Sequence, residues 1–450
     1  MSRDATWLVE VSPGETRAAL VDGRGQLIEL QVERLGRPEI VGSIHLGRVT
    51  RVDQGMGAAF VEFGDSQPGF LGKAKGVTEG EKLVVQVIRA AGGGKGAVLT
   101  ANPVLTGHFL MLDAMRPGIR WPRDWHGDKA ETAAALERIA PEDAGLTPRQ
   151  GAAGAGEALL RADLEALLRD WAEIRGAAGK ARPPAELMPA PALPLRILRD
   201  AAGPVVVDHP QVHARLKETG PAVAGRLELY KGDAPLFEEF GVEEQIEAAL
   251  APRVEMQGGA SLVVEETEAL IAIDVNMGGS GGRLPSESAT LKANQAAVRE
   301  AARQIRLRNI GGLIVIDFIS MKNKGNRRTI VEAMRREMRG DPVRHDVLGM
   351  TPAGLVEITR QRAGRPLAAL FARPRTAAPE PLPDAEACAA LRAALRQSWS
   401  GRPALAARPA VIEALQGPLA PALDEVNRRL GQPLELRAEP GREGFGILSG

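Results

Sequence analysis

The strongest constraint on the fold of this chain is a pair of aspartates, each of which closes a short apolar run. Asp274 follows the run at residues 269–273, and Asp317 follows the run at 312–316. Short runs rich in isoleucine and valine predict buried strands. A carboxylate inside a buried strand is unfavourable unless something compensates its charge.

Residues 284–308, between the two runs, are predicted to form one helix. Pro285 and Ser286 are start signals, Leu291, Val298 and Ile305 recur on one face, and two glycines at 311 and 312 end the pattern. Strand, helix and strand predict a right-handed crossover onto a parallel strand. If the strands are neighbours, they lie about 5 Å apart and both aspartates emerge at the same carboxyl edge, where open sheets bind ligands.

Two carboxylates this close repel each other unless a cation joins them. Hard oxygen ligands favour Mg²⁺, with Mn²⁺ as the alternative. Asn276 adds an amide on the same side of the strand as Asp274. The alternative is that each aspartate only caps the following turn. That explanation is good for one such aspartate but poorer for two that follow similar apolar runs.

Composition places the chain among soluble globular proteins of two to four domains. It has 450 residues, 44% hydrophobic and 25% charged. Its apolar runs are too short for a membrane span, and the N-terminus lacks a secretory signal, so we expect a cytoplasmic protein without membrane contact. The single cysteine, Cys388, excludes an intramolecular disulfide and a Cys-x-x-Cys metal site.

The formal net charge is zero, but the basic residues cluster. Eight Lys/Arg lie between Met321 and His345 against three acids, and four arginines lie on the predicted helix at 299–308. Such clusters beside an acidic site suit a polyanionic substrate. A solvated helix face is the alternative explanation for either cluster.

The remaining pattern divides the chain into further segments. Strands alternate over residues 1–35, and short strands with glycine turns at 43–101 predict a small barrel. Among its aromatic residues, Phe63 is predicted to be core, whereas Phe60 and Phe70 could be core or could stack on bases. Residues 179–194 and 371–384 read as linkers, and 385–450 as a small α+β module.

Several of these segments together resemble the ribonuclease E/G family. They are residues 43–52, 58–64, 69–71, 267–276 and 303–318, of which the last two are the most specific. The tail at 407–417 resembles the ribonuclease G branch more than ribonuclease E. The resemblance implies an α/β multidomain fold, an RNase H-like subdomain interrupted by an OB-type barrel and a 5′-sensor region, then a DNase I-like catalytic subdomain and a small module. The implied boundaries are 1–38 and 186–249 (RNase H-like), 39–104 (barrel), 105–185 (sensor), 250–370 (catalytic), 371–384 (linker) and 385–450 (module).

The resemblance also implies a magnesium-dependent endoribonuclease that hydrolyses single-stranded RNA in processing or turnover. Asp274 and Asp317 match the two magnesium-holding aspartates of the family, and Asn276 matches its catalytic-site asparagine. The implied chemistry is metal-assisted hydrolysis, with Asn276 holding a phosphate oxygen or a water. The alternatives are a family member that binds RNA or ribosomes without cutting, and a phosphoesterase for DNA or a small molecule.

Three further features follow from the resemblance. Phe60, Phe70 and Lys95 match positions that clamp RNA on the barrel. Arg149 matches the arginine that grips a 5′-phosphate, although Gln150 replaces the threonine expected beside it. The stretch at 369–378 lacks the family's zinc-link cysteines, so no zinc is expected, and a homodimer would have to form without it.

Overall fold

The computed structural model describes residues 5–36, 39–91, 96–122, 125–219, 225–256, 259–267, 269–277, 286–362, 365–373, 380–399 and 401–449. The chain divides into two compact units, which are described separately. The first unit is Met1–Arg37, Gly203–Pro210 and Glu228–Gly450, and the second is Pro38–Ala202 and Gln211–Leu227. Within the described residues, no helix is both long and apolar enough to cross a membrane.

The first unit opens with a five-stranded sheet. Its strands, in spatial order, are β15 (Leu227–Leu229), β14 (Val205–Val207), β1 (Thr6–Ser12), β2 (Glu15–Val21) and β3 (Leu27–Arg34). The helices α5 (Leu236–Glu239) and α6 (Val242–Leu250) follow it in the chain. Leu8 from the sheet and Phe237 from α5 are fully buried in one core, so the short helices close the apolar face of the sheet.

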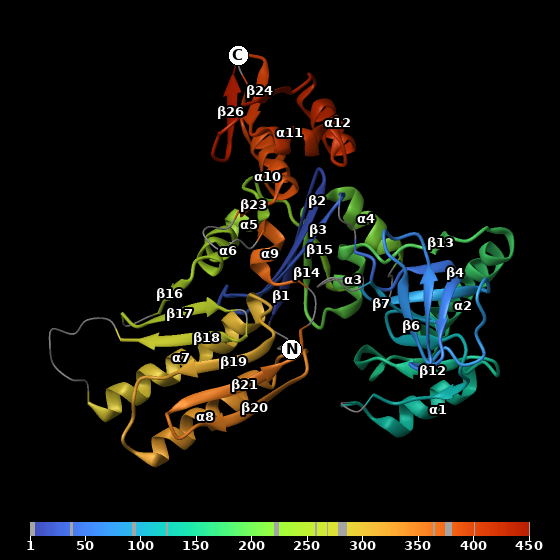
Figure 1. Ribbon diagram of the computed structural model, residues 1–450, viewed down its shortest axis with the longest axis horizontal. Helices are drawn as coiled ribbons and strands as arrows, with labels where there is room; N and C mark the ends of the chain where they lie inside the picture. The colour runs from blue at the N-terminus through green and yellow to red at the C-terminus, as the bar shows by residue number, and fades with distance from the viewer. Residues whose placement is uncertain are drawn as a thin grey trace. The chain divides into compact units, whose positions relative to one another are not determined.

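The second sheet of this unit carries the two aspartates and is called the aspartate sheet below. Its order is β16 (Arg253–Glu255), β17 (Ser261–Glu266), β18 (Ile271–Asn276), β19 (Gly312–Asp317), β21 (Leu355–Arg360) and β20 (His345–Met350). The helices α7 (Glu287–Leu307) and α8 (Lys324–Met338) lie along it (Figure 1). Their apolar faces share one core with Ile273 and Ile316, so one face of this sheet is buried.

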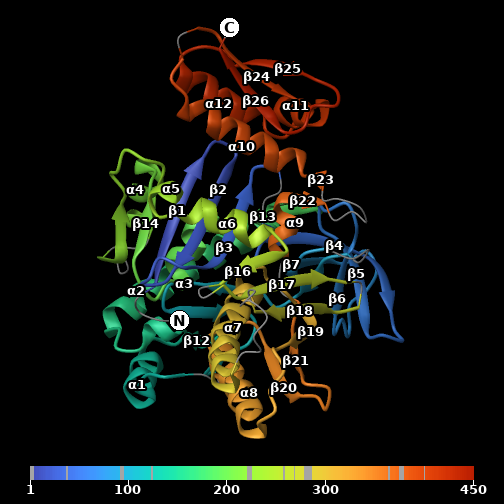
Figure 2. The ribbon, with the colours of Figure 1, turned by 90° about the vertical axis from the view of Figure 1, so that its left-hand side faces the viewer.

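A small C-terminal module completes the first unit (Figure 2). It consists of α10 (Pro383–Arg396), β24 (Pro403–Ala407), α11 (Pro409–Gln416), α12 (Ala420–Leu430), β25 (Glu435–Ala438) and β26 (Phe445–Ser449). Arg392 of α10 pairs with the fully buried carboxylate of Glu15 on β2, which fastens the module to the N-terminal sheet. Before it, α9 (Leu367–Phe371) and the short strands β22 (Ala372–Arg373) and β23 (Glu380–Pro381) flank residues 374–379 of the predicted linker, which lie outside the described residues.

The second unit contains a closed five-stranded barrel, as the density of short strands predicts. It runs through β4 (Ile44–Asp53), β5 (Ala58–Glu62), β6 (Gly69–Gly72), β8 (Val98–Thr100) and β7 (Lys82–Arg89), and β7 returns to pair with β4. Gly47 permits the closure, because a Cβ there would lie 2.4 Å from Val61 Cγ1.

The rest of the second unit is a four-stranded sheet with helices. The strands are β11 (Gly118–Ile119), β12 (Gly145–Pro148), β10 (Leu110–Asp113) and β9 (Val104–Thr106), and the helices are α1 (Lys129–Ile139), η1 (Gln150–Ala152), α2 (Glu157–Lys180), α3 (Leu193–Asp200) and α4 (Pro210–Thr219). The prediction of a linker at 179–194 is wrong. Part of that segment is β13 (Ala185–Met188), which pairs antiparallel with the first residues of β4.

Asp208 in the first unit makes stability depend on pH. Its Oδ1 accepts a hydrogen bond from the Val11 N–H at 2.9 Å. Burial, with a smaller contribution from the nearby Glu10 charge, raises the pKa of Asp208 to about 7. Because the folded state then binds this proton more tightly than the unfolded state, its stabilising contribution is present below about pH 4 and is lost as the pH rises towards 7.

We therefore predict that Asp208→Asn flattens the pH dependence of unfolding. The amide oxygen can still accept from Val11, but nothing titrates, so the loss of Tm between pH 5 and pH 8 should be smaller than in the wild type. The free energies of unfolding of the two proteins should diverge by at most about 1.4 kcal/mol per pH unit. Thermal unfolding measures it, with the exposed Asp233→Asn as the control for charge. A Tm profile of Asp208→Asn parallel to that of the wild type would contradict the assignment.

Candidate active site

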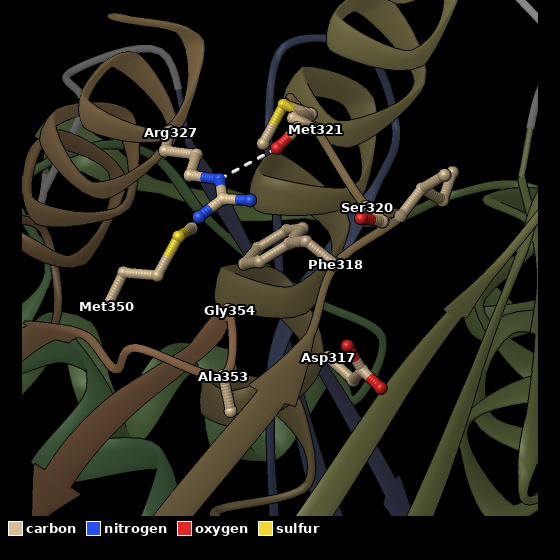
Figure 3. Close-up of a pocket in the computed structure, with 9 residues that line it drawn as sticks. Asp317, Phe318, Ser320, Met321, Arg327, Met350, Ala353 and Gly354 are labelled. Atoms are coloured by element: carbon tan, nitrogen blue, oxygen red, sulfur yellow. Dashed lines mark hydrogen bonds between the residues drawn. The ribbon is translucent and has the colours of Figure 1, made fainter. Parts of the chain in front are cut away.

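The two aspartates lie side by side at one edge of the aspartate sheet. β18 pairs with β19 in parallel, and Asp274 is in direct register with Asp317. The predicted connection of two parallel neighbouring strands through a helix is therefore confirmed, with α7 as the connecting helix. Figure 3 shows the Asp317 carboxylate at the end of β19. Neighbouring strands are about 4.8 Å apart, so two carboxylates on the same face can contact one cation.

Both carboxylates are exposed, although the strands that carry them contribute side chains to the core. Along β18 the side chains alternate, so that Ile273 and Val275 are buried while Asp274 is exposed, and Asp317 on β19 is exposed in the same way. Because α7 and α8 cover only one face of the sheet, the other face is open to solvent within this unit. The case for a cation thus rests on the proximity of two like charges and not on burial.

The donors around the pair fit a hard divalent cation. Among the described residues, no lysine or arginine forms an ion pair with Asp274 or Asp317. The Asn276 Nδ2 donates to Asp274 Oδ2 at 2.7 Å, which orients that carboxylate. Within the same residues, no group of three or more His, Cys, Asp or Glu could hold a metal by itself, so water and substrate oxygens would have to complete the coordination, as is usual for Mg²⁺.

Helix α7 holds the loop that follows Asp317. The fully buried Asn294 accepts from the Ile319 N–H at 3.1 Å and donates to the Ile319 carbonyl at 2.8 Å. At the first residue of the same helix, Glu287 accepts from the backbone N–H of Asn323 at 3.0 Å. These bonds fix the backbone two residues beyond Asp317, so the crossover helix also positions the carboxylate.

The barrel of the second unit displays an aromatic pair. Phe60 on β5 is opposite Phe70 on β6, with ring centroids 6.0 Å apart in an edge-to-face arrangement. Both rings are half-buried and lie outside the barrel core, whereas Phe63 is buried in it, as predicted. Arg51 of β4, the cross-strand partner of Phe60, places its guanidinium 4.4 Å from that ring centroid. The pair is therefore available for stacking, with a cation beside it.

Unlike the aromatic pair, two other predicted site residues, Lys95 and Arg149, are not shown by the structure to be available to RNA. Lys95 lies outside the described residues. Arg149, in the second unit, already has internal partners, because one terminal nitrogen donates to the Gly107 carbonyl at 2.7 Å and the other pairs with Asp200. A 5′-phosphate would have to compete with Asp200 for this guanidinium.

Sequence patterns alone did not indicate a role for Asn294, Glu287 or Arg51. Asn294 carried a signal, since it is a polar residue on the apolar face of the helix between Leu291 and Val298. The other two could not be found in this way. The contact of Arg51 depends on a register shift between Val49 and Arg51, and that of Glu287 on a loop distant in sequence.

The sequence of this chain is similar to those of known ribonucleases. The model of the ribonuclease E/G family matches residues 124–363. Ribonuclease G of Escherichia coli (strain K12) is 32% identical over 487 aligned positions that cover 99% of both chains. Ribonuclease G of Haemophilus influenzae is 34% identical over 79% of both chains, and ribonuclease E of the same organism is 34% identical over 77% of this chain and 40% of that protein.

A closed barrel that displays aromatic rings is a common platform for single-stranded nucleic acid. Together with the named relatives, it places the chain among hydrolases that act on nucleic acids. The chain belongs to the ribonuclease E/G family.

Asn294→Ala should lower both stability and activity. It leaves the N–H and carbonyl of Ile319 without partners, at a cost of about 1–3 kcal/mol in the free energy of unfolding. It should also lower kcat at a temperature at which the variant is fully folded. Urea unfolding and RNA cleavage assays measure the two effects. Gln304→Ala, a buried hydrogen-bonded position near the other end of α7, is the control that should lose stability alone. An unchanged kcat in Asn294→Ala would disprove the positioning role.

Proposed function

We propose that this chain is a magnesium-dependent endoribonuclease that hydrolyses single-stranded RNA in RNA processing or turnover. Membership of the ribonuclease E/G family supports the endoribonuclease activity, since the named relatives are ribonucleases G and E. The observation that supports the metal dependence is the direct parallel register of Asp274 and Asp317.

Asp274 and Asp317 would hold the ion, with Mn²⁺ as a competent substitute for Mg²⁺. When bound, a divalent cation polarises the scissile phosphate and neutralises charge that develops on it. The residues of the chain supply the geometry. Asn276 holds the Asp274 carboxylate in place through its Nδ2. Its amide oxygen could accept a hydrogen bond from a water or from a ribose 2′-hydroxyl of the RNA.

Binding of the single strand would use the barrel. The Phe60 and Phe70 rings present half-buried faces on which bases can stack without sequence preference. Arg51 beside Phe60 offers a donor to the phosphate of a stacked nucleotide. Lys95 stays a predicted phosphate contact on sequence grounds.

Zinc is not part of the proposal. Cys388 is fully buried against Gly14, and burial raises the pKa of its thiol to about 12. A zinc ligand must be a thiolate, so this side chain is poorly suited to the metal. A homodimer of this chain would therefore rest on other contacts.

The test is a cleavage assay with Mg²⁺ on one single-stranded RNA that carries a 5′-monophosphate, a 5′-triphosphate or a 5′-hydroxyl. We expect Asp317→Asn and Asp274→Asn to lower the rate by at least about 100-fold, since even hydrogen-bond partners of metal ligands are worth about 10–100-fold. Their affinity for RNA should stay close to that of the wild type, because no phosphate contact is removed. EDTA should stop the wild type, and Mg²⁺ should restore it.

The matched control is Asp346→Asn, which removes an exposed carboxylate from β20 of the same sheet and should keep full activity. Near-normal cleavage by Asp317→Asn would refute the metal assignment, and RNA binding without cleavage by the wild type would favour the non-catalytic alternative. Because Asp200 occupies Arg149, we expect only a small preference for the 5′-monophosphate.

A further inference from the structure

The loop after Asp317 encloses a small cavity of about 60 Å³ (Figure 3). Its lining includes Asp317, Phe318 and Met321 from that loop, Arg327 from α8, and Met350 and Gly354 from the segment around the end of β20. The guanidinium of Arg327 lies beside the Phe318 ring and is turned towards Met350. The Asp317 carboxylate lies on the other side of that ring (Figure 3). The cationic side chain of Arg327 and the carboxylate of Asp317 therefore line the same cavity.

Arg327 is held in place but is not neutralised. Its Nε donates to the Met321 carbonyl at 2.7 Å, which fixes the side chain over the first turn of α8. Among the described residues, its two terminal nitrogens have no hydrogen-bond partner, and no carboxylate lies within ion-pair distance. A half-buried guanidinium whose terminal N–H groups have no partner in the described part of the chain can bind an anion, and its planar fork matches phosphate.

A second, open cavity of about 330 Å³ shares Arg327 and Met350 with the first. It is also lined by Lys324 and Arg328, both exposed. The ion pair of Arg328 with Glu332, at 3.5 Å and largely in solvent, leaves most of that charge available. Three cationic side chains thus line an open cavity next to the one that Asp317 lines, an arrangement that suits a polyanionic strand.

We propose that Arg327 binds a backbone phosphate of the RNA that neighbours the cleaved one, at the start of a phosphate track formed with Lys324 and Arg328. This inference rests on the proposed function. The separation of Arg327 from Asp317 by the Phe318 ring makes the scissile phosphate itself the poorer match (Figure 3). The site therefore contributes to substrate binding and register and not to the chemical step.

The test compares Arg327→Gln, Arg327→Lys and the wild type on an RNA with one defined cut site. Arg327→Gln should raise KM roughly 10- to 100-fold, the value of a hydrogen bond to a charged group, with kcat unchanged. It should also lower the slope of log affinity against log salt by about 1, whereas Arg327→Lys should keep the slope. Arg336→Gln, an exposed arginine two turns further along α8, is the control for charge.

RNAs shortened from either end then locate the phosphate. The effect of Arg327→Gln should disappear when nucleotides on one side of the cut are removed and persist when the other side is shortened. An unchanged KM and salt slope, or a fall in kcat alone, would overturn the proposal.

Binding is also measured by fluorescence anisotropy in the Asp317→Asn background, where no cleavage is expected. Weaker binding of the Arg327→Gln double variant there supports the track even if the wild type fails to cut RNA. If the Asp317→Asn protein and the double variant bind RNA equally well, the phosphate track is refuted, whether or not the wild type cuts RNA. Failure of the track can therefore be distinguished from failure of the proposed function.

Discussion

The parallel pairing of β18 with β19 is the constraint on which the rest of the site depends. Parallel neighbours cannot be joined by a tight turn, so the chain must cross over, and α7 makes that crossing. The same helix buries Val298 and Ile305 in the core beneath the sheet. Its buried Asn294 then binds the loop beyond Asp317. One element thus provides the topology, the core and the placement of a carboxylate.

Exposure of the aspartates explains why the fold tolerates them. Two unit charges about 4 Å apart repel by about 1 kcal/mol in water and by several times as much in a low-dielectric interior. Because Asp274 and Asp317 lie on the open face of the sheet, the cost is near the lower value. The sheet can therefore form without a cation, and the proposed ion could leave the site without unfolding the protein.

The sequence predicted those parts of the structure that depend on local periodicity. The strand, helix and strand from residue 271 to residue 317 and the closed barrel follow from apolar spacing and turn residues. Contacts between distant segments could not be predicted in this way. The partners of Arg327 and Arg149 depend on where a loop carbonyl or Asp200 comes to lie in the fold. The segment at 179–194 misled because alanine and proline mark linkers and edge strands alike.

The most direct test of the proposed metal site is the anomalous scattering of crystals soaked in Mn²⁺. We predict one strong peak within about 2–2.5 Å of carboxylate oxygens of both Asp274 and Asp317. The same peak should be lost in Asp317→Asn crystals soaked in parallel. A peak elsewhere in the protein, or none between the two carboxylates at a Mn²⁺ concentration that supports cleavage, would contradict the claim that the paired strands build the metal site.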